Sequence, residues 1–234
     1  MDTILVEPPP LNKNDIEKIV GTKIKNIDIY QRAFTHKSAL KKYKLSKNFE
    51  TIEFMGDSVL GFVITKMLFD KYESEQEGFL TKIRTKLVRG DMLANIARKL
   101  GFRELVLMDD KGIRHGWNNN DNVLEDVFEA FVGAIYLDLG MVHAKKFILD
   151  IFNNPQYVNM NTILTVDDNF KDQLMRYCQA QKIKLPVYEI IQHDNNIFSV
   201  SVSVNGSTCG IGYAKNKKKA EQEAAGEAIR ELGI

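Results

Sequence analysis

The spacing of apolar residues divides the chain into two parts of different character. From Asn14 to about Asp150, apolar residues recur three and four positions apart with few alternations, which is the period of helices that bury one face. Residues 153–168 contain four Asn, one Pro and no Lys or Arg, and they follow neither the helical nor the strand period. The pattern therefore predicts an all-α domain over 1–152, a linker over 153–166 and a second domain over 167–234.

The second domain contains a strong strand signal. Residues 198–204 alternate Phe or Val with Ser at every step, as a strand with one covered face does. The Asn205-Gly206 pair that follows is typical of a tight hairpin because both residues tolerate positive φ. The other expected elements are a helix over 169–182, an extended run from Pro186, a strand over 207–213 and a helix from Ala220 whose alanines recur every four positions. The predicted order is α-β-β-β-α, and the fold class of the whole chain is α+β.

Composition limits the function classes. The chain of 234 residues is 44% hydrophobic and 27% charged, and its net charge is +1. These values exclude a wholly disordered chain. They also mean that any attraction for nucleic acid must come from local clusters of charge.

The sequence also limits the compartment. The longest strongly apolar stretch, 58–69, contains Lys66 and is well short of the roughly 20 residues that cross a bilayer. With only Cys178 and Cys209, a disulfide scaffold or structural zinc site is not expected. The first residues lack the basic and apolar pattern of a secretory signal. We therefore expect no membrane partner and a cytoplasmic, reducing location.

Two otherwise apolar helices carry acidic residues on one face. Glu50, Glu53 and Asp57 are three and four positions apart, and Asp126 and Glu129 are three apart in a second helix. Like charges at these spacings repel and burial adds a desolvation cost, so a cation or raised pKa values are needed. Carboxylates in this number suit Mg²⁺, with Mn²⁺ as a substitute, better than zinc.

The glycines in these helices favour close packing. Gly56, Gly61 and Gly133 remove side chains where the two backbones would approach. From the pattern alone, a helical bundle with solvated acidic faces remains an alternative to a metal site.

Several stretches resemble a known family. NFETIEFMGDSVL resembles the signature of the ribonuclease III endonucleases. An earlier segment of the same domain is resembled by RAFTHKSA, and two later segments by TKLVRGDMLANIARKLG and LEDVFEAFVGAIYLD. The resemblance covers nearly all of residues 15–150. KNKKKAEQEAA and the order of the C-terminal elements are similar to a double-stranded-RNA-binding domain. The chain is therefore identified as a member of the simple class, with one domain of each kind.

The resemblance implies an activity and a set of site residues. The activity is Mg²⁺-dependent hydrolysis of both strands of double-stranded RNA by a homodimer, with no covalent nucleophile and no small-molecule cofactor. The catalytic, metal-binding acids are then Glu53, Asp57, Asp126 and Glu129, the accessory acids are Glu50 and Glu77, and the aromatic residue that enters the partner subunit is Phe54. His36 is expected to be a packing or capping group.

The second domain should bind duplex RNA by shape, since A-form RNA hides its base edges. Lys217, Lys218 and Lys219 at the start of the last helix combine positive charge with a helix N-terminus, which favours phosphate. Further contacts are expected from Gln173, Arg176 and His193, although the His193 loop departs from the family pattern and Arg176 replaces the usual acid. An alternative from another class is a non-catalytic protein that shields or sequesters duplex RNA. A weaker alternative is a regulator that binds without cutting when magnesium is scarce.

Overall fold

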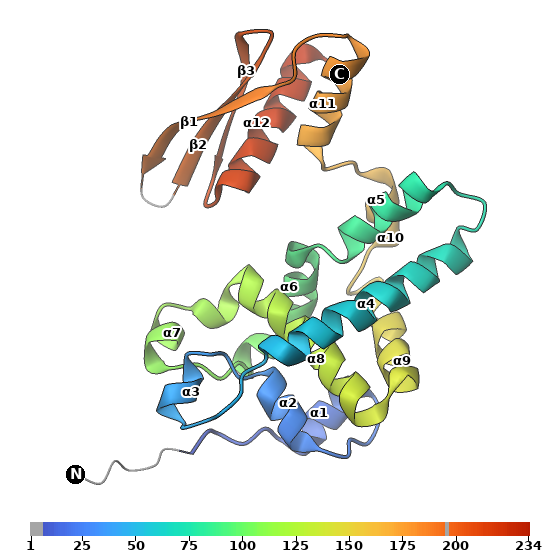
Figure 1. Ribbon diagram of the computed structural model, residues 1–234, viewed down its shortest axis with the longest axis vertical. Helices are drawn as coiled ribbons and strands as arrows, with labels where there is room; N and C mark the ends of the chain where they lie inside the picture. Colours follow the sequence, from blue (N-terminus) through green and yellow to red (C-terminus); the bar gives the residue numbers. More distant parts are fainter. Residues whose placement is uncertain (1–6, 195–196) are drawn as a thin grey trace. The chain divides into compact units, whose positions relative to one another are not determined.

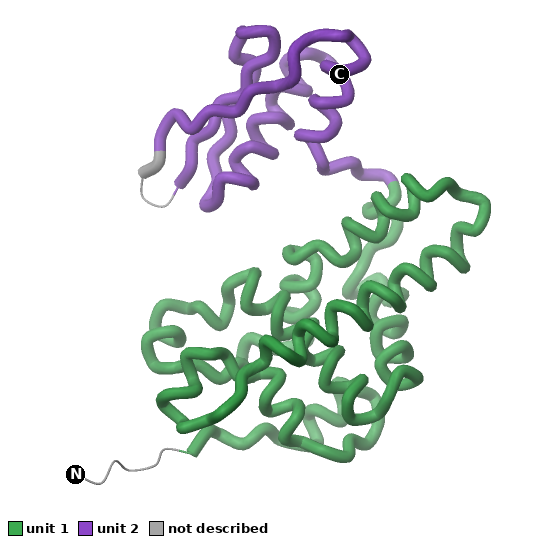
Figure 2. The backbone as a smooth tube through the Cα atoms, viewed as in Figure 1, with its two compact units in different colours: residues 1–164 green, residues 165–234 purple. Residues whose placement is uncertain are grey.

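Two compact units make up the protein, Met1–Leu164 and Thr165–Ile234 (Figure 2). The computed structural model describes residues 7–194 and 197–234, with the side chains of 193 and 194 outside the description. Figure 1 shows a helical first unit and a second unit that combines a sheet with two helices. This confirms the expected α+β class.

The first unit is built around α4 and α8, which pack on each other more extensively than any other pair of helices. Residues of α8 such as Leu124, Phe128 and Phe131 are fully buried because the residues of this helix that face its neighbours are apolar. The elements are α1 (Lys13–Val20), α2 (Ile27–Ala33), α3 (Ala39–Lys42), α4 (Glu50–Lys71), α5 (Glu77–Leu87), α6 (Gly90–Lys99), the 3₁₀ turn η1 (Phe102–Glu104), α7 (Asp110–Arg114), η2 (Trp117–Asn119), α8 (Asp121–Leu139), α9 (Met141–Phe152) and α10 (Met160–Thr165).

The segment predicted as a linker, 153–166, is structured. It contains α10, and Val158 and Ile163 lie in the core of the first unit. The buried Lys86 of α5 donates from Nζ to the carbonyl oxygen of Ile163 at 2.9 Å. The boundary between the compact units therefore falls between residues 164 and 165, twelve residues after the predicted end of the first domain.

The second unit has the order α11 (Phe170–Ala180), β1 (Val187–Asp194), β2 (Ile197–Val204), β3 (Ser207–Ala214) and α12 (Lys217–Leu232). The three strands form an antiparallel sheet in the order β1-β2-β3. Asn205 and Gly206 both have positive φ, 55° and 83°, so the hairpin is confirmed.

One face of the sheet is covered by helix α12. The valines at 200, 202 and 204 are buried, as the alternation with serine predicts. A Cβ added to Gly212 would lie 2.1 Å from the carbonyl oxygen of Ala220, and one added to Gly210 would lie 2.2 Å from that of Ala224. Glycines on β3 and alanines on α12 thus let the helix lie directly on the strand.

None of the helices in the described parts of the chain is long and apolar enough to cross a membrane.

Candidate functional site

Helices α4 and α8 touch backbone to backbone at two glycines. A Cβ added to Gly56 would lie 1.7 Å from the carbonyl oxygen of Glu129, and one added to Gly133 would lie 2.3 Å from that of Ile52. Both glycines therefore have the role that their positions predicted. Gly61 does not, because a Cβ there would meet nothing within 4 Å.

This crossing brings the four predicted acids together. Glu53 and Asp57 flank Gly56 on α4, and Asp126 and Glu129 lie on the adjoining turns of α8. Asp57 and Asp126 lie close enough to raise the pKa of both Glu53 and Glu129. We call these four residues, with Glu125, the acidic cluster.

Burial and mutual repulsion both disfavour charge in the acidic cluster. Burial, followed by repulsion from Asp57 and Glu125, raises the pKa of Glu129 to about 8. Burial, followed by repulsion from Asp126, raises the pKa of Glu53 to about 7. The pKa of Asp126 is also raised, mainly by burial. At neutral pH the cluster therefore favours either a proton or a cation.

Glu125 joins the cluster although it was absent from the predicted set. Its carboxylate lies against the backbone of Gly90, where an added Cβ would stand 2.2 Å from Oε2. Burial and repulsion from Asp126 raise the pKa of Glu125, and Glu125 in turn raises the pKa of Glu53 and Glu129. Its position four residues before Glu129, on the same helix face, is the signal that could have identified it.

The chemistry of the cluster suits a hard divalent cation, since all its donors are carboxylate oxygens. Within the residues that the structure describes, however, no three Asp, Glu, His or Cys side chains are placed to hold one metal ion together. Binding of an ion therefore requires carboxylates to rotate toward one another, and the charge of the ion would then offset their repulsion. The ligand set remains a prediction.

The two accessory acids occupy different places. Glu50, the first residue of α4, lies near the cluster and its Oε1 is 3.8 Å from Lys37 Nζ. Glu77, the first residue of α5, accepts a hydrogen bond from Thr81 Oγ1 at 2.8 Å. The whole of α4 separates the two, and its 22 residues span roughly 33 Å. A single chain therefore does not bring Glu77 to the acidic cluster.

An apolar stripe follows the exposed side of α4. Phe54, Phe62 and Phe69 are 74%, 62% and 56% exposed, and their spacing of eight and seven residues places them on one face. Phe54 is thus not core.

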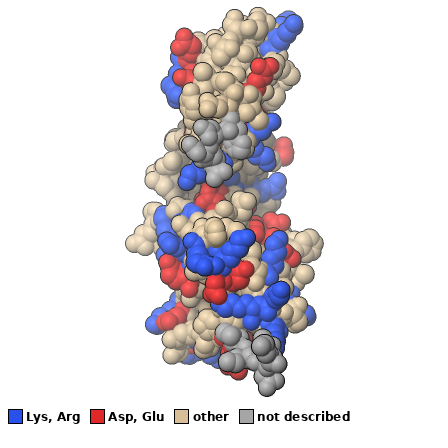
Figure 3. Space-filling model, turned by 90° about the vertical axis from the view of Figure 1, so that its left-hand side faces the viewer, with Lys and Arg blue, Asp and Glu red and all other residues tan. Residues whose placement is uncertain are grey.

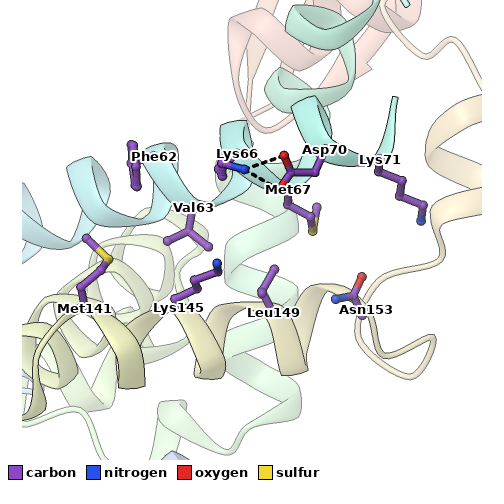
Figure 4. A pocket seen from close by; sticks show the side chains of 10 residues that line it. All are labelled: Phe62, Val63, Lys66, Met67, Asp70, Lys71, Met141, Lys145, Leu149 and Asn153. Atoms are coloured by element: carbon purple, nitrogen blue, oxygen red, sulfur yellow. Dashed lines mark hydrogen bonds and ion pairs between the residues drawn. The ribbon is translucent and has the colours of Figure 1, made fainter. Parts of the chain in front are cut away.

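A hollow of about 310 Å³ lies beside Phe62, between α4 and α9 (Figure 4). The side chains of Met141 and Leu149 line it from α9, and the Lys66–Asp70 ion pair borders it on α4. It adjoins the C-terminal half of α4, whereas Glu53 and Asp57 of the acidic cluster lie in the N-terminal half.

His36 has a structural role. The backbone N–H of Ser38 donates to its Nδ1 at 3.1 Å, and its ring packs on Phe49 with centroids 5.8 Å apart. These contacts are those of a capping and packing group, as expected.

In the second unit, the lysine triplet lies at the start of α12. Lys217, Lys218 and Lys219 are exposed, and the Asn216 side chain caps the helix by accepting from the Lys219 N–H at 2.8 Å. The first turn of α12 therefore presents positive charge at the favourable end of the helix dipole.

The other predicted RNA contacts are engaged within the chain. Gln173 Nε2 donates to the carbonyl oxygen of Asp167 at 2.7 Å. Arg176 forms ion pairs with Asp172 at 2.9 Å and Asp167 at 3.4 Å. His193 lies in β1, but its side chain is outside the described residues.

Comparisons with known proteins agree with this architecture. The family described as Ribonuclease-III-like matches residues 26–155, and the double-stranded RNA binding motif matches residues 170–232. The putative protein A464R of Paramecium bursaria Chlorella virus 1 is 37% identical, over 95% of this chain and 80% of its own length. Ribonuclease 3 of Chlorobium chlorochromatii is 35% identical, over 96% of this chain and 92% of its own.

A solved structure matches the first unit. The nuclease domain of ribonuclease III from Campylobacter jejuni has a TM-score of 0.57 and 35% sequence identity, and the match covers 61% of this chain and 98% of that one. The helical unit with its acidic crossing and the α-β-β-β-α unit together define an endoribonuclease specific for double-stranded RNA. The chain belongs to the ribonuclease III family.

Proposed function

We propose that the protein is a Mg²⁺-dependent, homodimeric endoribonuclease that hydrolyses both strands of double-stranded RNA at the acidic cluster. The observation that carries this proposal is the Gly56–Gly133 crossing, which stacks two acidic pairs and leaves Glu53 and Glu129 with raised pKa values of about 7 and 8. A cluster that holds charge so unfavourably is well suited to a divalent cation.

Four residues would hold the ion: Glu53, Asp57, Asp126 and Glu129. Mg²⁺, for which Mn²⁺ is the expected substitute, lowers the pKa of a bound water and stabilises charge on phosphate oxygens when it is bound. The carboxylates must lose their protons to bind it, and the high pKa of Glu129 makes this residue the most sensitive to pH. No covalent nucleophile is needed.

The proposal of a homodimer rests on the apolar stripe of Phe54, Phe62 and Phe69. Large aromatic side chains exposed along one helix face indicate a surface that another protein covers. A symmetric dimer through this stripe supplies two acidic clusters, one for each strand of a duplex. Glu50 can act beside its own cluster, whereas Glu77 is far from it along α4 and would act at the cluster of a second copy or at the interface.

The second unit would bind the duplex through phosphates. Lys217, Lys218 and Lys219 supply charge at a helix N-terminus, a combination that favours phosphate. Gln173 and Arg176 can contribute only if they exchange their contacts with Asp167 and Asp172 for RNA. His193 is proposed as a further contact on its sequence position.

The decisive experiment is incubation with a long, perfect RNA duplex, with and without Mg²⁺, followed by sizing of the products. The expected result is metal-dependent shortening of both strands, with single-stranded RNA of the same sequence left intact. Glu129→Gln should abolish cleavage and retain duplex binding. If the duplex is bound but remains intact in Mg²⁺ and in Mn²⁺, the protein is a non-catalytic duplex-RNA binder.

A further inference from the structure

The carboxylate of Glu125, the fifth in the acidic cluster, lies against backbone. Glu125 stands one helical turn before Glu129 on α8. A Cβ added to Gly90 would lie 2.2 Å from Oε2 of Glu125, 2.6 Å from Cδ and 2.8 Å from Oε1. The carboxylate therefore occupies the space that any side chain at residue 90 would fill. Glycine at this position lets the carboxylate lie beside the cluster.

The contact is made at the N-terminus of a helix that packs on α8. Gly90 is the first residue of α6, and the side chain of the N-cap residue Arg89 does not cap this helix. The first N–H groups of a helix have no partner within it, and the positive end of the helix dipole favours an anion. The N-terminus of α6 thus helps to hold the carboxylate of Glu125 next to the other acids of the cluster.

Glu125 differs from two acidic neighbours because no cation balances it. Asp91, which lies near it, forms a 2.6 Å ion pair with Arg89. Asp121, another neighbour, pairs with Arg98 at 2.6 Å. Within the described part of the chain, no ion pair involves the carboxylate of Glu125. Acidic side chains elsewhere on the first unit, on the side where α3 and α7 lie, stand among Lys and Arg side chains (Figure 3). The charge of Glu125 is therefore available to a bound cation.

The hydration of a hard divalent cation gives such a carboxylate a role. Mg²⁺ usually retains several water molecules when carboxylates bind it, and groups around a metal site orient the ligands by hydrogen bonds. A carboxylate beside the ligands accepts hydrogen bonds from these waters and adds negative charge that attracts the ion. Glu125 is close enough for this role, since its charge raises the pKa of both Glu53 and Glu129.

We propose that Glu125 is a positioning residue of the nuclease site, whose carboxylate, lying against Gly90, accepts hydrogen bonds from water molecules of the divalent cation that the four proposed ligands bind. Gly90 then belongs to the site as well, because it provides the space for this carboxylate. This inference rests on the proposed function.

The test measures Mn²⁺ binding by the full chain without RNA, from the electron paramagnetic resonance signal of the free ion. Glu125→Gln removes the charge and keeps the size of the side chain. Gly90→Ala displaces the carboxylate and should cost little stability, because the added Cβ meets the end of a flexible side chain. The controls are Glu104→Gln, at an exposed position outside the cluster, and Gly61→Ala, whose Cβ meets nothing within 4 Å.

Glu125→Gln and Gly90→Ala should each raise the dissociation constant for Mn²⁺ about tenfold, as is typical when a group that orients metal ligands is lost. Both controls should leave it unaltered. The double variant should bind Mn²⁺ no more weakly than Glu125→Gln alone, because the glycine acts through the carboxylate. The Mg²⁺ concentration for half-maximal cleavage should rise by the same factor, with a smaller loss of rate at saturating Mg²⁺.

Unfolding in a chelator separates this role from a purely structural one. Glu125→Gln removes a half-buried charge from among like charges, so the free energy of unfolding without metal should stay the same or rise. The inference is overturned if Gly90→Ala binds Mn²⁺ as Gly61→Ala does, if the losses add in the double variant, or if Glu125→Gln is destabilised in the chelator. Each of these results leaves cleavage by the unsubstituted chain intact. If that chain neither binds Mn²⁺ nor cuts a duplex, the proposed function fails as well.

Discussion

The carbonyl oxygen of Glu129 lies so close to Gly56 that a Cβ added to the glycine would stand 1.7 Å from it. The residue that contributes a carboxylate to the acidic cluster thus uses its main chain for the tightest contact between α4 and α8. Helix packing and site geometry are coupled at this point. A change in the distance between the helices must change the spacing of the acids.

Gly56→Ala is expected to destabilise the first unit by about 3 kcal/mol or more, because backbone on α8 cannot move aside as a flexible side chain can. Cleavage should fall about 100-fold or more, since a displacement of about 1 Å is costly in catalysis. Denaturant unfolding and single-turnover cleavage measure the two effects.

The control for this substitution is Gly61→Ala on the same helix. A Cβ there meets nothing within 4 Å, so the change should leave stability unaltered or raise it by up to about 1 kcal/mol through helix propensity. Equal losses in the two variants would contradict the role of the crossing.

Without metal, the stability of the first unit should fall as pH rises. The carboxyls of Glu53 and Glu129 have pKa values of about 7 and 8 in the folded chain, against an ordinary value of 4.5. The folded state therefore holds more protons than the unfolded state between pH 4.5 and about 8, and its stability decreases through that window. Thermal unfolding in a chelator should show the decrease.

Two further measurements identify its cause. Glu129→Gln should flatten the pH dependence, whereas Glu104→Gln, at an exposed position outside the cluster, should not. Mg²⁺ should raise the unfolding temperature more at the alkaline end of the window, where the carboxylates are ionised. Identical pH profiles for the two variants would exclude Glu129 as the source.

Local sequence signals predicted much of the fold. Asn205-Gly206 specifies its hairpin because both residues tolerate the positive φ that this turn requires. The helical part of 153–166 was not predicted, because α10 is stabilised by burial of Ile163 and by Lys86, which is far away in the sequence. Such tertiary contacts leave no period in the segment itself.

The candidate site was also predicted only in part. The spacing of Glu53, Asp57, Asp126 and Glu129 indicated their shared location, because helix geometry fixes which residues share a face. Glu125 was missed although it precedes Glu129 by four residues on the same helix face; its spacing does not show that its carboxylate packs against Gly90 of a third helix. Sequence spacing also cannot specify the rotation of the carboxylates, which determines whether three of them can share an ion.

Loss of the apolar stripe should weaken the dimer. Replacing Phe54 and Phe62 together by Ala removes two exposed aromatic side chains, each of which contributes about 1.5–3 kcal/mol when buried. The dissociation constant should therefore rise about 100-fold or more, with the monomer fold unchanged. Sedimentation velocity over a range of concentrations measures this change.

Leu185→Ala is the control for the stripe, because Leu185 is an exposed apolar residue of the second unit. It should leave the sedimentation coefficient unaltered. A Phe54→Ala/Phe62→Ala chain that sediments as the unsubstituted protein does at every concentration would show that another surface forms the dimer, or that none does.

The start of α12 should govern binding by the second unit. Replacing Lys217 and Lys218 by Gln removes two exposed charges and keeps the Asn216 cap that orders the helix N-terminus. Duplex affinity should fall, and the slope of the logarithm of affinity against the logarithm of salt concentration should decrease by about two.

Lys182→Gln/Lys184→Gln, which removes two exposed lysines of the same unit, should have little effect. If the two pairs weaken binding equally, net charge rather than the helix N-terminus determines affinity. The α12 pair should raise KM for cleavage more than it lowers kcat, because none of the acids in the cluster is altered.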